Sequence, residues 1–166
     1  AKKANEPLHV QYSYDDGSVA VVNDLYEGFK GVKVSAEVFD FSLESKFSQQ
    51  AIVDVGPDAV VRALTIPKGT DLTTTYFVRL RLDDASGREV SRNFYWLSTR
   101  DHVLDWKNTK WYYSPTSRHA DLTALAKLPP TTLQVSSAGG RVTVKNTGNA
   151  LAFQVRLKAV DPQSGE

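Results

Sequence analysis

Cysteine is absent from this chain of 166 residues, which excludes disulfide scaffolds, thiol nucleophiles and zinc sites built on thiolates. Methionine is absent too, and the chain starts at Ala1, so we expect a processed chain or a piece of a longer one. No apolar run approaches the roughly 18–20 residues that cross a bilayer, so no membrane segment is expected. The 20 basic and 19 acidic residues nearly balance, which argues against a nucleic-acid partner.

Residues 1–99 show the short alternating segments that are typical of β-strands. The whole chain has seven Phe, seven Tyr and three Trp residues, which suit a pleated, half-buried surface. Turn signals such as Asp15-Asp16-Gly17 separate the segments. We expect strands at residues 8–14, 18–23, 32–38, 46–55, 59–66, 76–82 and 90–98.

Seven strands within 99 residues predict an all-β, immunoglobulin-like β-sandwich, with an up-and-down barrel as the alternative. Apolar residues occupy every second position of the strands at 32–38 and 76–82, so they lie on one face. The residues expected in the core are therefore Val34, Val38, Val78, Leu80 and Leu82.

The connector at residues 100–130 breaks the alternation and gathers four aromatic residues within eight positions, namely Trp106, Trp111, Tyr112 and Tyr113. Two interpretations fit them. The rings pack the connector against a neighbouring domain, since each can bury about 150–250 Å². Alternatively, their faces stack on sugar rings, and the four residues are then the candidate substrate-binding site. Packing is the favoured interpretation.

The end of the connector predicts a short helix at residues 120–127. Thr116 or Ser117 is the expected cap, and Pro129-Pro130 ends the helix. Residues 131–166 then alternate again, and we expect strands at 133–135, 142–144 and 151–157. Three strands cannot close a sandwich, so this second domain is expected to be incomplete. It would be completed by another segment, by strand exchange or self-association, or by packing within the chain.

Residues that could carry out chemistry are scarce. His9, His102 and His119 lack the spacing of metal ligands, so we interpret each as a surface residue. The pairs Asp15-Asp16 and Asp83-Asp84 fall at predicted turns, and neighbouring strand residues point to opposite faces. A calcium site at the second pair would lack further oxygen ligands. We therefore expect no catalytic residue, no metal and no cofactor.

Three stretches carry a resemblance to a known family. They are AKKANEPLHVQYSY at residues 1–14, SRNFYWLS at 91–98, and KNTGNALAF at 145–153 followed by VRL at 155–157. Together they resemble the region after the catalytic barrel in glycoside hydrolase family two. The branch is that of the exo-β-D-glucosaminidases, β-mannosidases and mannosylglycoprotein endo-β-mannosidases.

The resemblance implies that residues 1–99 are a fourth domain and 131–166 the opening strands of a fifth. The family's catalytic glutamates lie in its (β/α)8 barrel, and no residue here corresponds to them. The chain is then a non-catalytic accessory region of a retaining, exo-acting β-glycosidase that acts on glycans or chitosan-like polysaccharide. Its partners would be the barrel and the other domains of an exported parent.

Two alternatives stay open on the residues alone. One is a stand-alone carbohydrate-binding module that uses the connector aromatics to hold an oligosaccharide. The other, weaker alternative is an adhesion-type sandwich that binds no sugar.

Overall fold

The computed structural model describes residues 6–69, 71–158, 160 and 163. The chain divides into two compact units, Ala1–Ala124 and Leu125–Glu166. The predicted domain boundaries at residues 99 and 130 stay predictions. No helix in the described ranges is both long and apolar enough to cross a membrane.

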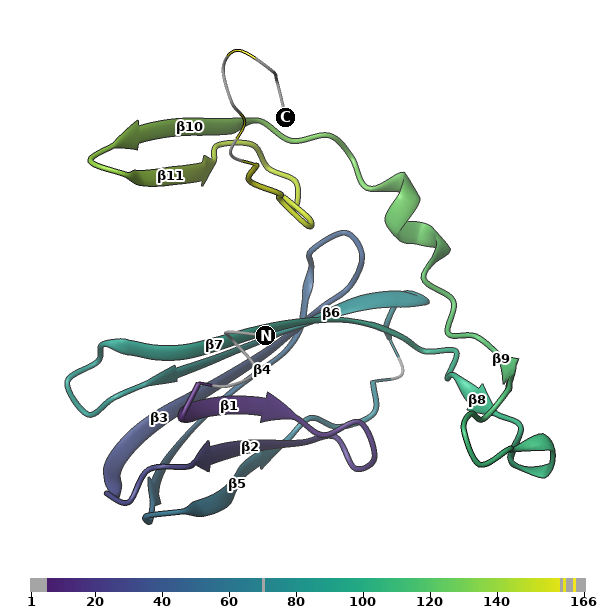
Figure 1. Ribbon diagram of the computed structural model, residues 1–166, viewed down its shortest axis with the longest axis horizontal. Helices are drawn as coiled ribbons and strands as arrows, with labels where there is room; N and C mark the ends of the chain where they lie inside the picture. The colour runs from purple at the N-terminus through teal and green to yellow at the C-terminus, as the bar shows by residue number, and fades with distance from the viewer. Residues whose placement is uncertain (1–5, 70, 159, 161–162, 164–166) are drawn as a thin grey trace. The chain divides into compact units, whose positions relative to one another are not determined.

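The first unit contains two antiparallel sheets (Figure 1). Their strands confirm the predicted immunoglobulin-like sandwich, because the seven strands form two separate sheets and not one closed barrel. One sheet has the order β1-β2-β5, with β1 (Leu8–Tyr12), β2 (Ser18–Asn23) and β5 (Ala59–Thr65). The other has the order β4-β3-β6-β7, with β4 (Ser45–Val55), β3 (Phe29–Phe39), β6 (Thr75–Asp83) and β7 (Glu89–Ser98).

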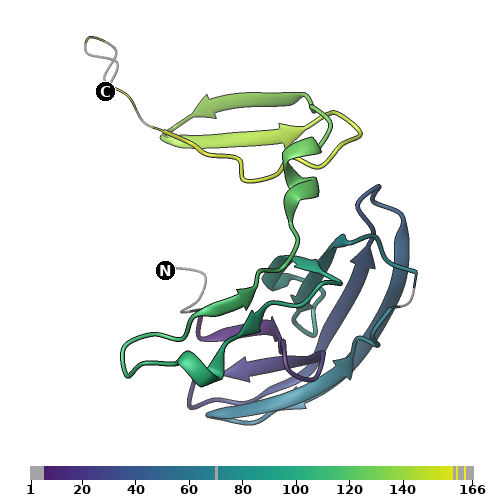
Figure 2. The same ribbon diagram turned by 90° about the vertical axis from the view of Figure 1, so that its right-hand side faces the viewer.

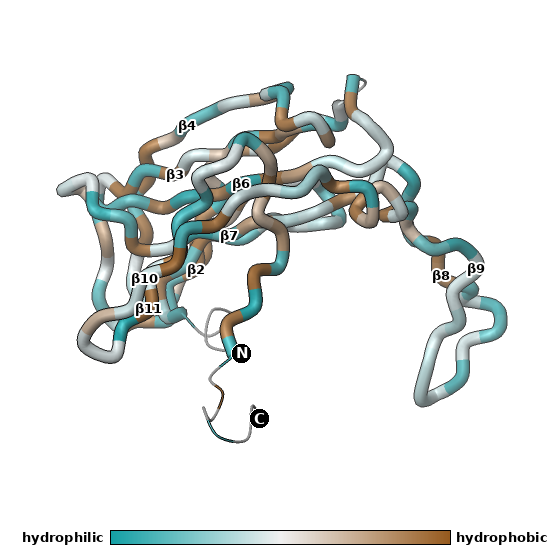
Figure 3. The backbone as a smooth tube through the Cα atoms, turned by 90° about the horizontal axis from the view of Figure 1, so that it is seen from above, coloured by the Kyte–Doolittle hydropathy of each residue, from teal (hydrophilic) through white to brown (hydrophobic). Residues whose placement is uncertain are grey.

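The core lies between these two sheets, and the five predicted core residues are all 2% exposed or less. The register pairs Val38 with Val78 and Val34 with Leu82, so their side chains share the inner face of the sheet. Figure 3 shows how hydrophobic and hydrophilic residues alternate along the strands of this unit. This alternation lets one face of each sheet pack inward while the other stays polar.

Phe77 lies on the outer face of β6 and is nonetheless fully buried. Its ring stacks on Phe94 of β7 with 5.5 Å between centroids, and on Phe41 after β3 with 6.2 Å. This outer aromatic stack joins β6 and β7 to the turn after β3 and adds a second small apolar cluster.

The connector forms a small hairpin of β8 (Val103–Leu104) and β9 (Thr116–Arg118), with the 3-10 turn η2 (Trp106–Asn108) between them. The helix predicted at 120–127 is shorter than expected, because it is the five-residue 3-10 helix η3 (Thr123–Lys127) that forms there. Thr116 and Ser117 lie in β9 and do not cap it. At the start of η3, Asp121 Oδ1 accepts from the Thr123 backbone N–H at 3.2 Å and from the Thr123 hydroxyl at 2.7 Å.

The second unit is built on one hairpin, β10 (Leu133–Ala138) and β11 (Arg141–Asn146), shown in Figure 2. Gly139 and Gly140 form its turn with φ angles of 55° and 73°, which glycine adopts at little cost. The third strand predicted at 151–157 is wrong. Gln154 has a left-handed φ of 50° that breaks the extended run after Phe153.

Candidate functional site

The four aromatic candidates lie on the segment that joins β8 to β9, residues 105–115, which we name the aromatic loop. Its base is closed by the Asp105 backbone N–H, which donates to the Pro115 carbonyl at 2.8 Å. The Asp105 side chain also caps η2 and accepts from the Asn108 amide nitrogen at 2.6 Å. At the tip, the Lys110 backbone N–H donates to the Tyr113 carbonyl at 2.9 Å. Short-range hydrogen bonds therefore join the two ends of the loop and close its tip.

The four aromatic side chains of the aromatic loop point into solvent and are between 53% and 96% exposed. Trp111 meets Tyr112 edge to face at 5.3 Å, and Tyr112 meets Tyr113 at 5.4 Å with 31° between the ring planes. Trp106 lies apart in sequence on η2. The favoured interpretation predicts that these rings contact either a β-sandwich or a missing neighbour. Because the four rings are exposed, the group that would cover them is either a neighbouring domain or a ligand.

The hairpin also brings two histidines together that lie 17 positions apart in sequence. The rings of His102 and His119 are 5.5 Å apart between centroids, and Thr116 Oγ1 lies 3.2 Å from His102 Nε2. Local spacing could not reveal this pair, because only the β8–β9 pairing creates it. Within the described residues, no group of three or more His, Cys, Asp or Glu side chains is arranged to hold a metal ion.

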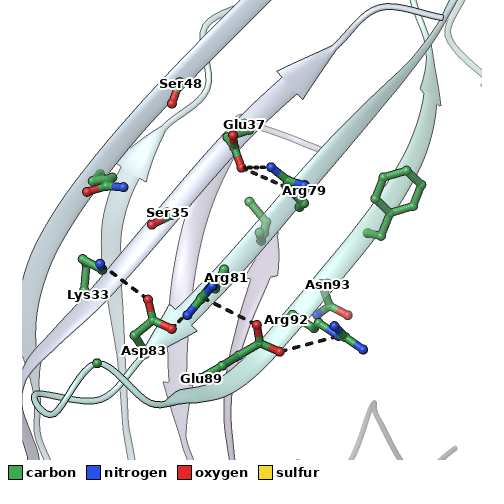
Figure 4. Close-up of a pocket in the computed structure, with 14 residues that line it drawn as sticks. Lys33, Ser35, Glu37, Ser48, Arg79, Arg81, Asp83, Glu89, Arg92 and Asn93 are labelled. Atoms are coloured by element: carbon green, nitrogen blue, oxygen red, sulfur yellow. Dashed lines mark hydrogen bonds and ion pairs between the residues drawn. The ribbon is translucent and has the colours of Figure 1, made fainter. Parts of the chain in front are cut away.

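A second candidate site is the groove of about 820 Å³ over the outer face of the β3-β6-β7 sheet, shown in Figure 4. The charged side chains that line this groove form ion pairs with one another. Arg79 contacts Glu37 at 2.7 Å, and Asp83 is contacted by Arg81 at 2.6 Å and Lys33 at 3.6 Å. The hydrogen bond from Arg81 to Asp83 raises the pKa of the guanidinium.

Glu89 extends this set of ion pairs, because its carboxylate lies 3.5 Å from Arg81 and 3.6 Å from Arg92. These charges satisfy one another, so the groove has little net charge to offer a ligand. Its cross-strand pairs instead stabilise the exposed sheet face.

Asp15 and Asp16 lie in the β1–β2 turn and Asp84 follows β6, as expected, whereas Asp83 is the last residue of β6. Asp16, Asp83 and Asp84 face basic side chains, and Asp15 has no ion pair among the described residues. Asp16 pairs with Arg62 at 2.7 Å, and Asp84 pairs with Arg88 at 3.1 Å. A carboxylate that is already paired with a guanidinium is a poor calcium ligand, which disfavours the calcium alternative at Asp83-Asp84.

Two family profiles match the chain. One, described as a mannosidase Ig/CBM-like domain, matches residues 16–99, and the other, described as an exo-beta-D-glucosaminidase Ig-fold domain, matches residues 111–166. The chain belongs to the Ig-fold domains of the exo-β-D-glucosaminidase family, in glycoside hydrolase family two. The predicted family resemblance is thereby confirmed.

Known exo-β-D-glucosaminidases match nearly the whole chain. The enzyme of Streptomyces avermitilis is 46% identical over 161 residues, which cover 90% of this chain and 18% of that protein. The enzyme of Amycolatopsis orientalis is 41% identical over 174 residues, covering 97% of this chain and 17% of that protein. The chain therefore spans less than a fifth of the relatives it matches.

Solved structures give the same result. The crystal structure of the Amycolatopsis orientalis exo-chitosanase CsxA matches with a TM-score of 0.80 and 38% identity, over 89% of this chain and 19% of that one. A complex of a CsxA variant with PNP-beta-D-glucosamine matches with the same TM-score and identity.

Proposed function

We propose that this chain is the non-catalytic accessory region of a retaining, exo-acting β-glycosidase of the glucosaminidase type, acting on chitosan-like oligosaccharides. The observation that carries the proposal is the match over 90% of the chain to an exo-β-D-glucosaminidase that is more than five times as long. A retaining glycosidase needs two carboxylates about 5–5.5 Å apart across the scissile bond. In each pair of adjacent acidic residues, one carboxylate is held by an arginine, Asp16 by Arg62 and Asp84 by Arg88, which supports a role outside catalysis.

The aromatic loop is, in this proposal, the contact with the rest of the parent enzyme and one wall of its substrate cleft. An exposed cluster of large rings marks an interaction surface, because single exposed apolar residues are common but contiguous ones are not. Trp111 and Tyr112 stand at 81° to each other. Such crossed rings suit a shaped contact better than a flat platform for an extended polysaccharide.

The alternative is a stand-alone carbohydrate-binding module. Its support is the CBM-like description of the profile that matches residues 16–99, together with the exposure of the aromatic loop. In that case Trp111 would bind sugar in the isolated chain, without any parent enzyme.

Trp111→Ala, made both in the full-length parent and in the isolated chain, tests the two roles. The accessory role predicts that the parent loses at least about tenfold in kcat/KM on a β-glucosaminide, or melts at a lower temperature. It predicts that the isolated chain hydrolyses no p-nitrophenyl β-glucosaminide and that the substitution leaves its oligosaccharide binding unchanged. Tyr26→Ala is the matched control, because Tyr26 is 94% exposed on another turn. An unchanged parent, or loss of binding by the isolated variant, would contradict the accessory role.

A further inference from the structure

A second groove, of about 720 Å³, lies at one end of the first sandwich, where the β1–β2 turn, the β5–β6 connection and the start of the connector meet. We name it the end groove. The lining residues used below are Tyr12, Tyr14, Asp15, Tyr76 and Asp101. All of them belong to the first unit, and none belongs to the aromatic loop.

Tyr14 supplies an exposed aromatic face at this groove. Its side chain is 72% exposed, yet the ring is fixed edge to face against Tyr12 at 5.7 Å and against Tyr95 at 6.1 Å. A ring held in place by two neighbours loses little conformational entropy when a ligand stacks on it. The apolar face of a pyranose ring is a natural partner for such a surface.

Two half-buried phenols also line the end groove. The hydroxyls of Tyr12 and Tyr76 make no hydrogen bond to any other residue in the described part of the chain. Burial raises the pKa of Tyr76 to about 12 and that of Tyr12 above its usual value, so both hydroxyls stay protonated at neutral pH. Each can therefore donate a hydrogen bond to a ligand as well as accept one.

The charges around the groove are mainly negative. Asp15 and Asp101 have no ion pair among the described residues, whereas Asp16 is paired with Arg62 at 2.7 Å. The basic side chains among the described residues that line the groove are Lys68 and His102. Among the described residues, the groove thus presents two carboxylates that form no ion pair, unlike the outer-face groove, whose charges pair with one another. The Arg118 guanidinium donates to the Asp101 backbone carbonyl at 3.1 Å and not to its carboxylate.

We infer that the end groove binds an oligosaccharide of glucosamine, a cationic amino sugar, as a site separate from the aromatic loop. Asp15 and Asp101 would accept hydrogen bonds from the sugar ammonium groups, Tyr14 would stack on a ring face, and Tyr12 and Tyr76 would bond to hydroxyls. The choice of amino sugar rests on the proposed function. The carboxylates favour it over a neutral sugar, because ammonium groups complement their charge.

Calorimetric titration of the 166-residue chain with glucosamine tetrasaccharide and with its N-acetylated counterpart tests this site. We expect the cationic tetrasaccharide to bind at least about tenfold more tightly, with an affinity that falls as salt is added. Tyr14→Ala and Asp101→Asn should each weaken binding by roughly fivefold or more. The matched controls Tyr26→Ala and Asp24→Asn alter exposed residues outside the groove and should change nothing.

The outcomes distinguish a failure of the end-groove proposal from a failure of the proposed function. Equal binding of both tetrasaccharides, or no binding of either, would overturn the end groove as an amino-sugar site and leave the accessory role standing. Binding that is lost with Trp111→Ala but kept with Tyr14→Ala would place the sugar at the aromatic loop and overturn both. Circular dichroism of every variant shows whether a loss of binding reflects unfolding, and variants that unfold are replaced by Tyr14→Leu and Asp15→Asn.

Discussion

The backbone N–H of Tyr12 donates a hydrogen bond of 3.1 Å to the phenol oxygen of Tyr95, 83 positions further along the chain. Tyr12 ends β1 of the three-stranded sheet, and Tyr95 lies in β7 of the four-stranded sheet. The amide of Asn93, two residues before Tyr95, donates to the Val10 carbonyl at 2.7 Å. Side chains of the edge strand β7 therefore form hydrogen bonds with backbone groups of the edge strand β1. Those backbone groups are then not available to pair with an added strand.

Tyr95→Phe should lower the free energy of unfolding of the first unit by about 1 kcal/mol, because it removes the acceptor of the half-buried Tyr12 N–H while keeping the ring. Urea denaturation followed by circular dichroism measures the change. Tyr26→Phe removes the same hydroxyl from a side chain that is 94% exposed, and it should have no effect. Equal stability of the two variants would show that the cross-sheet hydrogen bond contributes nothing.

Val38→Asp should destabilise the first unit by about 3 kcal/mol or more, or prevent it from folding. Val38 is 2% exposed between the sheets, and no basic side chain lines that core to pair with a carboxylate. Val60→Asp places the same group on β5 at a position that is 63% exposed, and it should cost less than about 1 kcal/mol. Thermal melting of both variants gives the comparison, and a folded Val38→Asp protein of wild-type stability would refute the assigned core.

The first sandwich was predictable from the sequence because its physical signal is local. Period-two alternation states which side chains of a strand face inward, so the burial of Val38 and Val78 could be predicted without knowing which strands pair. Their position opposite each other is a property of the fold. The same logic missed Phe77, since alternation assigns it to the polar face. It is buried there only because Phe41 and Phe94, distant in sequence, cover it.

The other differences between the prediction and the structure also arise from contacts between residues distant in sequence or from the backbone conformation. Residues 151–157 alternate as a strand should, but a strand also needs a partner and an unbroken extended backbone, and Gln154 with φ of 50° breaks the run. At the candidate sites, the four rings of the aromatic loop could be predicted from the sequence because they lie within eight positions of one another. The end groove was not, because Tyr14, Tyr76 and Asp101 come together only through the fold.

Gly17→Ala should destabilise the β1–β2 turn more than an equivalent change elsewhere. Gly17 has φ of 70°, and a Cβ there would lie 2.8 Å from the Ile66 carbonyl oxygen, closer than the two atoms can approach. Gly87 has φ of 83° but open space around it, so Gly87→Ala carries only the conformational cost of about 1 kcal/mol. We expect Gly17→Ala to exceed that cost by at least about 1 kcal/mol in urea denaturation. Equal losses would mean that the turn shifts away from Ile66 freely.

Asp84→Asn should make stability depend less on pH in the acid range. The carboxylate accepts from the Ser86 hydroxyl at 2.6 Å and from the Arg88 backbone N–H at 3.1 Å, and these bonds lower the pKa of Asp84 to about 2, the Ser86 hydroxyl being the largest cause. A folded-state pKa below the ordinary value of 3.8 means that the ionised group stabilises the turn above that pH. The stabilisation is then lost as the pH falls from 3.8 towards 2.

The melting temperature should therefore be lower for Asp84→Asn than for the wild type at pH 7, and the two should converge near pH 2. Asparagine keeps an acceptor oxygen for Ser86 but removes the charge and the second oxygen that accepts from Arg88 Nε at 3.1 Å, so the comparison measures the ionised carboxylate with its arginine partner. Asp24→Asn, at an exposed position with no side-chain hydrogen bond among the described residues, should follow the wild type at every pH. A gap between Asp84→Asn and wild type that stays constant from pH 7 to pH 2 would show that the carboxylate does not stabilise this turn through its charge.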